Sequence, residues 1–206
     1  VNSSAPGGDT PQQRGLKDLE HVELSTRHQC ILHRATRQCG GEPATRNRKL
    51  AEARELLALA DIAPRNRIVV EDIDLREDLR AMIHLEVPVA CQPGEDNVPV
   101  MFSRALIGFT YPCVGFQRPL AGYSFFQILL PRNIWLAQIK QPEQALCIAP
   151  QVSAGTRTAM LVLRAYGALS MQSIQLDDHD PAGLFSPSIA RWWQSNLHRV
   201  PLTRTA

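Results

Sequence analysis

The feature that most constrains this sequence is a change of hydrophobic period at Pro64. Before it, apolar residues recur at steps of three and four, whereas beyond it they recur at every second position. Residues 80–90 show this best, because Ile83, Leu85 and Val87 alternate with Met82, His84, Glu86 and Pro88. A period of two is that of a strand with one buried face. The chain beyond Pro64 is therefore predicted to be mainly β-structure.

Short segments rich in β-branched and aromatic residues follow Pro64, with turn residues between them. No helical pattern separates them, which favours antiparallel over parallel pairing. We therefore predict an all-β, mainly antiparallel fold, an eight-stranded jelly-roll-like sandwich. The predicted strands are 67–75, 80–90, 98–109, 122–130, 133–140, 145–150, 158–169 and 171–176.

One amphipathic helix is predicted at about 46–61, where Leu50, Ala53, Leu56 and Leu57 recur at helical steps. Pro64 lies just beyond its end. Residues 1–45 lack a clear period, although the short segment at 15–24 fits a strand or a helix equally well. We predict two parts: an extended basic N-terminal arm over 1–45, and a β-sandwich domain with a C-terminal tail over 46–206.

The charge of the chain is concentrated in one stretch. The formal net charge is only +2, but residues 27–49 hold six basic residues and the single acid Glu42. Such a local excess neutralises phosphates without reading a base sequence. The predicted nucleic-acid-binding residues are Arg27, Arg34, Arg37, Arg46, Arg48 and Lys49.

Two clusters contain metal-ligating residue types. Imidazole and thiolate together suit zinc, but the spacing of the first cluster completes no usual zinc frame, which favours a basic arm with incidental cysteines. Carboxylates of the second cluster suit a hard cation, but a solvated turn before Pro181 explains them as well. The candidates are His28, Cys30, His33 and Cys39 in the first cluster, and Asp177, Asp178 and Asp180 in the second.

No catalytic or cofactor motif stands out. The sequence contains no G-x-S-x-G, H-E-x-x-H, Walker loop or paired C-x-x-C, so we expect no cofactor and no enzymatic activity. The five cysteines are an odd number at long spacings, which favours reduced thiols over a disulfide framework. The apolar runs are shorter than the roughly 18 residues that a membrane span needs, so we expect no membrane partner.

These features lead to a hypothesis of a structural coat subunit. In layout the chain is similar to the small coat proteins of icosahedral RNA viruses, which implies a self-assembling capsid protein in a virion or the host cytoplasm. The basic arm would then contact neighbouring subunits and packaged nucleic acid. The alternatives are a cellular nucleic-acid-binding or regulatory β-domain in the cytoplasm and, less favoured, an enzyme whose site no motif reveals.

Overall fold

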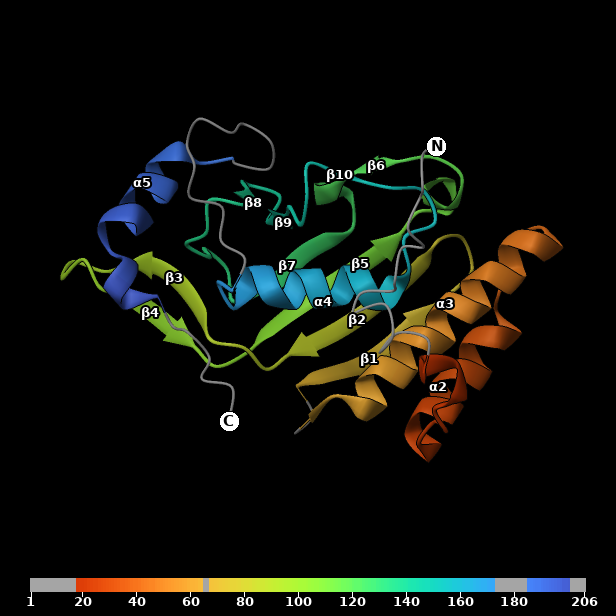
Figure 1. Cartoon of the computed structure of the whole chain (residues 1–206). Helices are drawn as coiled ribbons and strands as arrows, with labels where there is room; N and C mark the ends of the chain where they lie inside the picture. The colour runs from red at the N-terminus through yellow and green to blue at the C-terminus, as the bar shows by residue number, and fades with distance from the viewer. Residues whose placement is uncertain (1–17, 65–66, 173–184, 201–206) are drawn as a thin grey trace, which may run out of the picture.

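The computed structural model describes residues 18–64, 67–172 and 185–200 (Figure 1). Its largest element is a six-stranded antiparallel sheet in the order β1-β2-β5-β7-β9-β8. The first four strands of this order follow one another along the chain, and each pairs with the next, so they form a meander. The strands are β1 (Ile68–Asp74), β2 (Leu79–Leu85), β5 (Ala105–Tyr111), β7 (Phe126–Leu130), β8 (Ile139–Lys140) and β9 (Ala145–Leu146).

Alternation of side chains gives this sheet one buried face. In β2 every second residue from Leu79 to Leu85 is buried. The pairing places Ile83 of β2 opposite Ile107 of β5, and Ile107 opposite Ile128 of β7, so three buried isoleucines form one row across the sheet. The predicted period of two therefore sets which face meets the core.

Helices cover the buried face. The helix α3 (Pro43–Ile62) packs against β1 and against α4 (Thr158–Leu169), and α2 (Thr26–Arg37) packs against α3 and β1. Figure 1 shows α4 crossing the sheet and α3 running beside β1. Because α3 is contacted from several sides, even Lys49, Glu52 and Glu55 of this helix are buried.

Smaller elements complete the described chain. A hairpin of β3 (Val89–Pro93) and β4 (Pro99–Phe102) lies beside α5 (Pro187–Ser195), and β6 (Leu120–Ala121) pairs with β10 (Gln151–Val152). The indole N–H of Trp193 in α5 donates to the carbonyl of Trp135, 2.6 Å away. The 3-10 helices are η1 (Asp18–His21), η3 (Cys113–Phe116), η4 (Gly122–Ser124) and η5 (Leu197–Arg199).

The structure confirms antiparallel β-structure beyond Pro64 and the helix predicted at 46–61, which is α3. A jelly-roll and a count of eight strands are not confirmed. The predicted strand at 158–169 is wrong, because these residues form α4. Its sequence is almost continuously apolar, which fits a buried strand as well as a helix. Only Ile139–Lys140 of the predicted strand 133–140 is a strand, and most of 171–176 lies outside the described residues.

The prediction of an extended arm over 1–45 is wrong for its described part. Residues 26–37 form α2, whose first turn is capped by the Ser25 hydroxyl accepting from the N–H of His28. Leu19 and Ile31 join the same core as the sheet, so this segment packs on the body of the protein. The sequence does not reveal this helix clearly, because two of its three buried positions are the histidine His28 and the small residue Ala35 and only Ile31 is a large apolar residue. Residues 1–17 lie outside the described part.

Among the described residues, we find no helix long and apolar enough to cross a membrane.

Candidate nucleic-acid interface

The most basic feature of the fold is the outer side of α2. The helix carries three arginines and two histidines and no acidic residue. Cys30, His33, Arg34 and Arg37 are exposed at steps of three, four and seven residues, so they share one side of the helix, while Ile31 and Ala35 are buried on the other. We call Arg27, His33, Arg34 and Arg37 the α2 surface.

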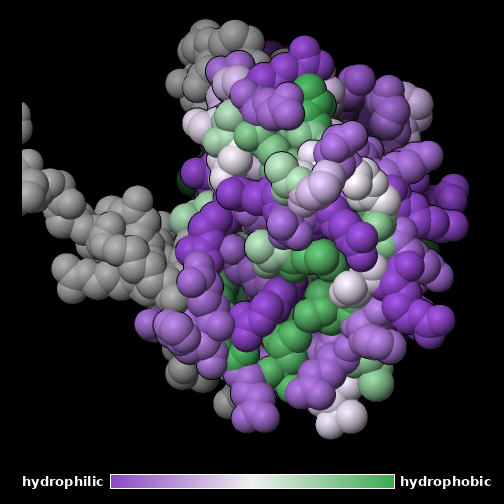
Figure 2. All heavy atoms as spheres, turned by 90° about the vertical axis from the view of Figure 1, so that its right-hand side faces the viewer, coloured by the Kyte–Doolittle hydropathy of each residue, from purple (hydrophilic) through white to green (hydrophobic). Residues whose placement is uncertain are grey.

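The α2 surface contains a shallow hollow. Its volume is about 300 Å³, and it is lined by His33, Arg34, Arg37 and Gln38. All four side chains are exposed, and all are hydrogen-bond donors or can become donors. Figure 2 shows the side of the molecule that lies on the right of Figure 1, where α2 and the start of α3 are found, and most side chains there are hydrophilic.

Two arginines of the α2 surface have acidic partners on β1. Arg27 Nη2 lies 2.8 Å from Glu71 Oε2, and Arg34 Nη2 lies 2.5 Å from Asp72 Oδ1. The side chains of both pairs are between about a third and three fifths exposed. Exposed pairs of this kind contribute only about 0–1 kcal/mol, so a phosphate is able to compete for these arginines. Arg37 has no ion pair among the described residues.

The two arginines at the start of α3 differ from each other. Arg46 is exposed, and its side chain makes no hydrogen bond or ion pair with a described residue. Arg48, in contrast, lies 2.7 Å from Glu52 Oε1 and donates to the carbonyl of Gly155 at 3.0 Å. Its guanidinium also lies over the ring of Phe116. Arg48 therefore connects α3 to η3 and to the segment that precedes α4.

Lys49 is predicted to bind nucleic acid, but the structure places it in the interior, so this assignment is wrong. Its side chain is fully buried. The ammonium group donates to the carbonyls of Leu75 and Glu77, at 2.6 Å and 2.8 Å. These carbonyls lie in the connection between β1 and β2, so Lys49 holds that turn against α3. A phosphate cannot reach a group enclosed in this way.

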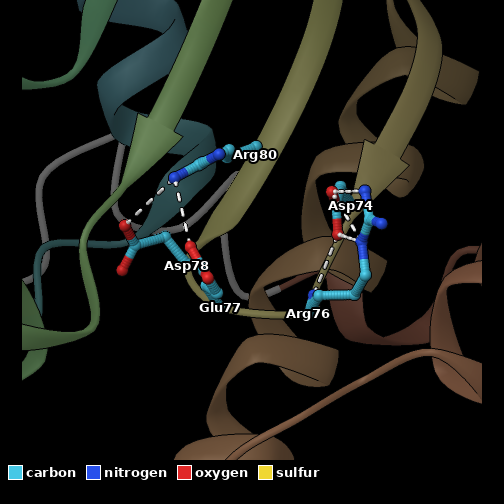
Figure 3. A pocket seen from close by; sticks show the side chains of 5 residues that line it. All are labelled: Asp74, Arg76, Glu77, Asp78 and Arg80. Atoms are coloured by element: carbon cyan, nitrogen blue, oxygen red, sulfur yellow. Dashed lines mark hydrogen bonds and ion pairs between the residues drawn. The ribbon is translucent and has the colours of Figure 1, made fainter.

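The β1–β2 turn has its own charged pocket (Figure 3). It has a volume of about 210 Å³. Hydrogen bonds from the side chain and backbone of Arg76 lower the pKa of Asp74 to about 2. Acidic residues outnumber arginines here, so this pocket does not extend the basic surface. Its lining residues are Asp74, Arg76, Glu77, Asp78 and Arg80.

Sequence reasoning missed a charged cluster between α3 and α4. Glu52 Oε2 accepts from the N–H of Thr158 at 2.7 Å, and Arg157 Nε donates to Glu55 Oε2 at the same distance. Burial raises the pKa of Glu55, against the opposing hydrogen bond from Arg157. These carboxylates lie at the N-terminal end of α4, where the helix dipole favours negative charge. Spacing alone gives no sign of this role, since Glu52 and Thr158 are distant in sequence.

The first metal candidate is not assembled. His28 is buried, and its Nδ1 lies 2.9 Å from Asp61 Oδ1. Cys30 lies about 200° around the helix from His28, because each residue advances it by 100°. His33 is exposed and Cys39 is buried beyond the end of α2. Across the described part of the chain, no three His, Cys, Asp or Glu side chains gather as metal ligands.

The second metal candidate, Asp177, Asp178 and Asp180, lies outside the described residues. Comparison of the chain with protein-family models, curated proteins and solved structures finds no match. The functional proposals below therefore depend on the contacts and charges of the described residues.

Proposed function

We propose that the protein binds nucleic acid through the α2 surface. The observation that supports this most directly is a helix without an acidic residue that exposes three arginines and His33 to solvent, while His28 is buried. Because α2 packs on α3 and β1, these side chains are displayed from a fixed element. Such a surface positions guanidinium groups for the phosphate backbone.

The expected recognition is of the backbone charge and not of base sequence. The α2 surface contains no Phe, Tyr or Trp for base stacking, and its donors suit phosphate oxygens of any nucleic acid. Binding of this kind weakens steeply as salt increases, because condensed counterions are released on binding. Binding of backbone phosphates by these arginines is expected both for a coat subunit and for a cellular nucleic-acid-binding domain.

Removal of Arg37, which has no ion pair with a described residue, tests the proposal. We expect Arg37→Ala to weaken binding of a labelled DNA or RNA oligonucleotide and to lower the salt slope by about 1, as for the loss of one phosphate contact. Fluorescence anisotropy between about 50 and 200 mM salt measures both quantities. Arg191→Ala is the matched control, because Arg191 is also an exposed helical arginine but lies on α5, away from α2.

If Arg37→Ala and Arg191→Ala change the affinity and salt slope equally, binding is a property of net charge and the α2 surface is not the site. If the unaltered protein binds neither DNA nor RNA at low salt, the proposed function itself is wrong.

A second substitution is expected to change the affinity and the salt slope in the opposite direction. Asp72→Asn removes the acidic partner of Arg34, so Arg34 becomes available to a phosphate. We expect tighter binding and a salt slope that is larger by about 1. Isothermal titration with the same oligonucleotide measures the change. Glu143→Gln, between β8 and β9 at the opposite edge of the sheet from β1, makes the same change in net charge and likewise removes the acidic partner of a cation, Lys140. An equal gain there would contradict the role of Arg34.

The coat subunit remains a second proposal, together with its jelly-roll sandwich and its location in a virion or the host cytoplasm. It is supported by the basic α2 surface at one end of the molecule and by the strand β4, which has no charged residue, at the other. It requires closed particles that contain nucleic acid. Light scattering of the protein mixed with RNA tests this. If only small complexes form, the coat-subunit proposal is wrong and the proposal of a nucleic-acid-binding domain remains.

A further inference from the structure

The strand β4 has one edge with no partner among the described strands. It forms a two-stranded sheet with β3, and no other described strand pairs with it. Unpaired strand edges expose N–H and C=O groups that are suited to pairing with another chain. Many proteins protect such edges with charged residues, but Pro99–Phe102 contains none.

The hydrogen bonds on the side of β3 that faces away from β4 show which backbone groups of β4 point outward. The carbonyl of Ala90 accepts from Trp135, and the N–H of Gln92 donates to Asn133, so both groups point away from β4. By alternation, the groups of Cys91 point toward β4 and meet those of Val100, its pairing partner. The carbonyl of Pro99, both backbone groups of Met101 and the N–H of Ser103 therefore point outward. Pro99 lacks an N–H, which suits an outward position on an edge strand.

The side chains along this edge are apolar and open to solvent. Between 44% and 51% of the surface of each is exposed. Consecutive apolar exposure of this kind is unusual for a strand of a monomer and marks a surface that another chain covers. The residues are Val98, Val100, Met101 and Phe102.

The two ends of the edge carry opposite charges. Glu95 and Asp96 lie in the turn before β4, and Arg104 follows its end. All three are exposed, and none has an ion pair with a described residue. In an antiparallel pair of two β4 strands, the acidic end of each copy meets the arginine of the other. The edge is thus complementary in charge to itself.

The hairpin is held in place before any partner arrives. The indole N–H of Trp192 donates to Asn97 Oδ1 at 3.0 Å, and Arg199 donates to the carbonyl of Asn97 at 2.9 Å. Both donors belong to the segment of α5 and η5. A fixed edge loses little conformational entropy on pairing, which favours association.

We propose that β4 pairs with β4 of a second copy of the chain, antiparallel and two-fold symmetric, so that two hairpins form one four-stranded sheet. With Met101 on the axis, Met101 N–H donates to the Met101 carbonyl of the other copy, and Ser103 N–H donates to its Pro99 carbonyl. By symmetry this makes four backbone hydrogen bonds. The dimer does not depend on nucleic-acid binding, since α2 lies at the other end of the molecule.

Light scattering coupled to size-exclusion chromatography tests the dimer without nucleic acid. We expect a mass of twice 22.9 kDa that falls to 22.9 kDa on dilution. Met101→Lys places two like charges on the axis and is expected to weaken association by about tenfold or more. Met82→Lys is the matched control, because Met82 is 40% exposed on the large sheet, and it leaves the mass unchanged. Circular dichroism confirms that both variants are folded.

Charge reversal gives a sharper test of the register. Arg104→Glu alone and Asp96→Arg alone each place like charges at both ends of the paired edges, so each is expected to be largely monomeric. An equimolar mixture of the two restores opposite charges at both ends and forms a mixed dimer. A monomer at every concentration overturns the proposal, as does a dimer that Met101→Lys leaves intact or a mixture that stays monomeric.

Discussion

Glu52→Ala is expected to lower the free energy of unfolding by about 3 kcal/mol. Glu52 joins α3 to the start of α4: within α3 its Oε1 lies 2.7 Å from Arg48, and its Oε2 accepts the N–H of Thr158 in α4. Its side chain is only 4% exposed. Truncation therefore leaves a buried N–H and a guanidinium without their acceptor.

The size of this effect depends on how far water can hydrate the two groups that lose the carboxylate of Glu52. Breaking a buried ion pair costs about 3–5 kcal/mol when the remaining charge stays dry. Arg48 is 42% exposed and regains part of its hydration, so the lower end of that range applies. The N–H of Thr158 is enclosed between the helices and gains no such compensation. Urea unfolding measured by circular dichroism gives the difference.

Two variants make the result specific to the carboxylate. Glu52→Gln keeps an acceptor oxygen of the same size, and we expect it to lose only about half as much stability. Glu23→Ala removes an exposed glutamate that has no hydrogen bond to a described side chain, and its effect is expected within about 0.5 kcal/mol. A loss for Glu52→Ala no greater than for Glu23→Ala would show that Glu52 does not stabilise the start of α4.

Periodicity predicts the parts of this fold where one face of an element is polar. The alternation in 79–85 identifies β2 and its buried face correctly, because solvent on the outer face leaves polar residues there. It fails for 158–169, because α4 lies between other elements and is apolar almost all round. It also fails for 26–37, where buried positions are filled by His28 and Ala35 and the apolar period fades.

The candidate site could be predicted as a location but not as a set of contacts. The excess of basic residues in 27–49 points correctly to a basic surface on α2. The same count gives equal weight to Arg37, which is exposed, and to Lys49, which is buried. Their roles differ because the partners of Lys49 are carbonyls of Leu75 and Glu77, and backbone acceptors leave no mark in a sequence.

Lys49→Met is expected to lower the free energy of unfolding by about 2–4 kcal/mol, although methionine keeps most of the apolar stem. The loss has a polar origin, because two hydrogen bonds from a charged donor disappear, and each such bond contributes about 1.5–3 kcal/mol. The carbonyl of Leu75 keeps the N–H of Gly40 as a donor, and the carbonyl of Glu77 keeps the thiol of Cys113. Relief of the desolvation cost of the ammonium group reduces the total. Thermal unfolding followed by circular dichroism measures the change.

The same variant separates a structural role from a role in nucleic-acid binding. Because the ammonium group of Lys49 is enclosed, we expect folded Lys49→Met protein to bind oligonucleotides with an unchanged salt slope. Arg46→Met is the matched control, since Arg46 lies three residues earlier on α3, is exposed and has no described side-chain partner. It is expected to leave stability within about 0.5 kcal/mol. A reduced salt slope for Lys49→Met with unchanged stability would return Lys49 to the phosphate-binding surface and reverse its assignment to the β1–β2 turn.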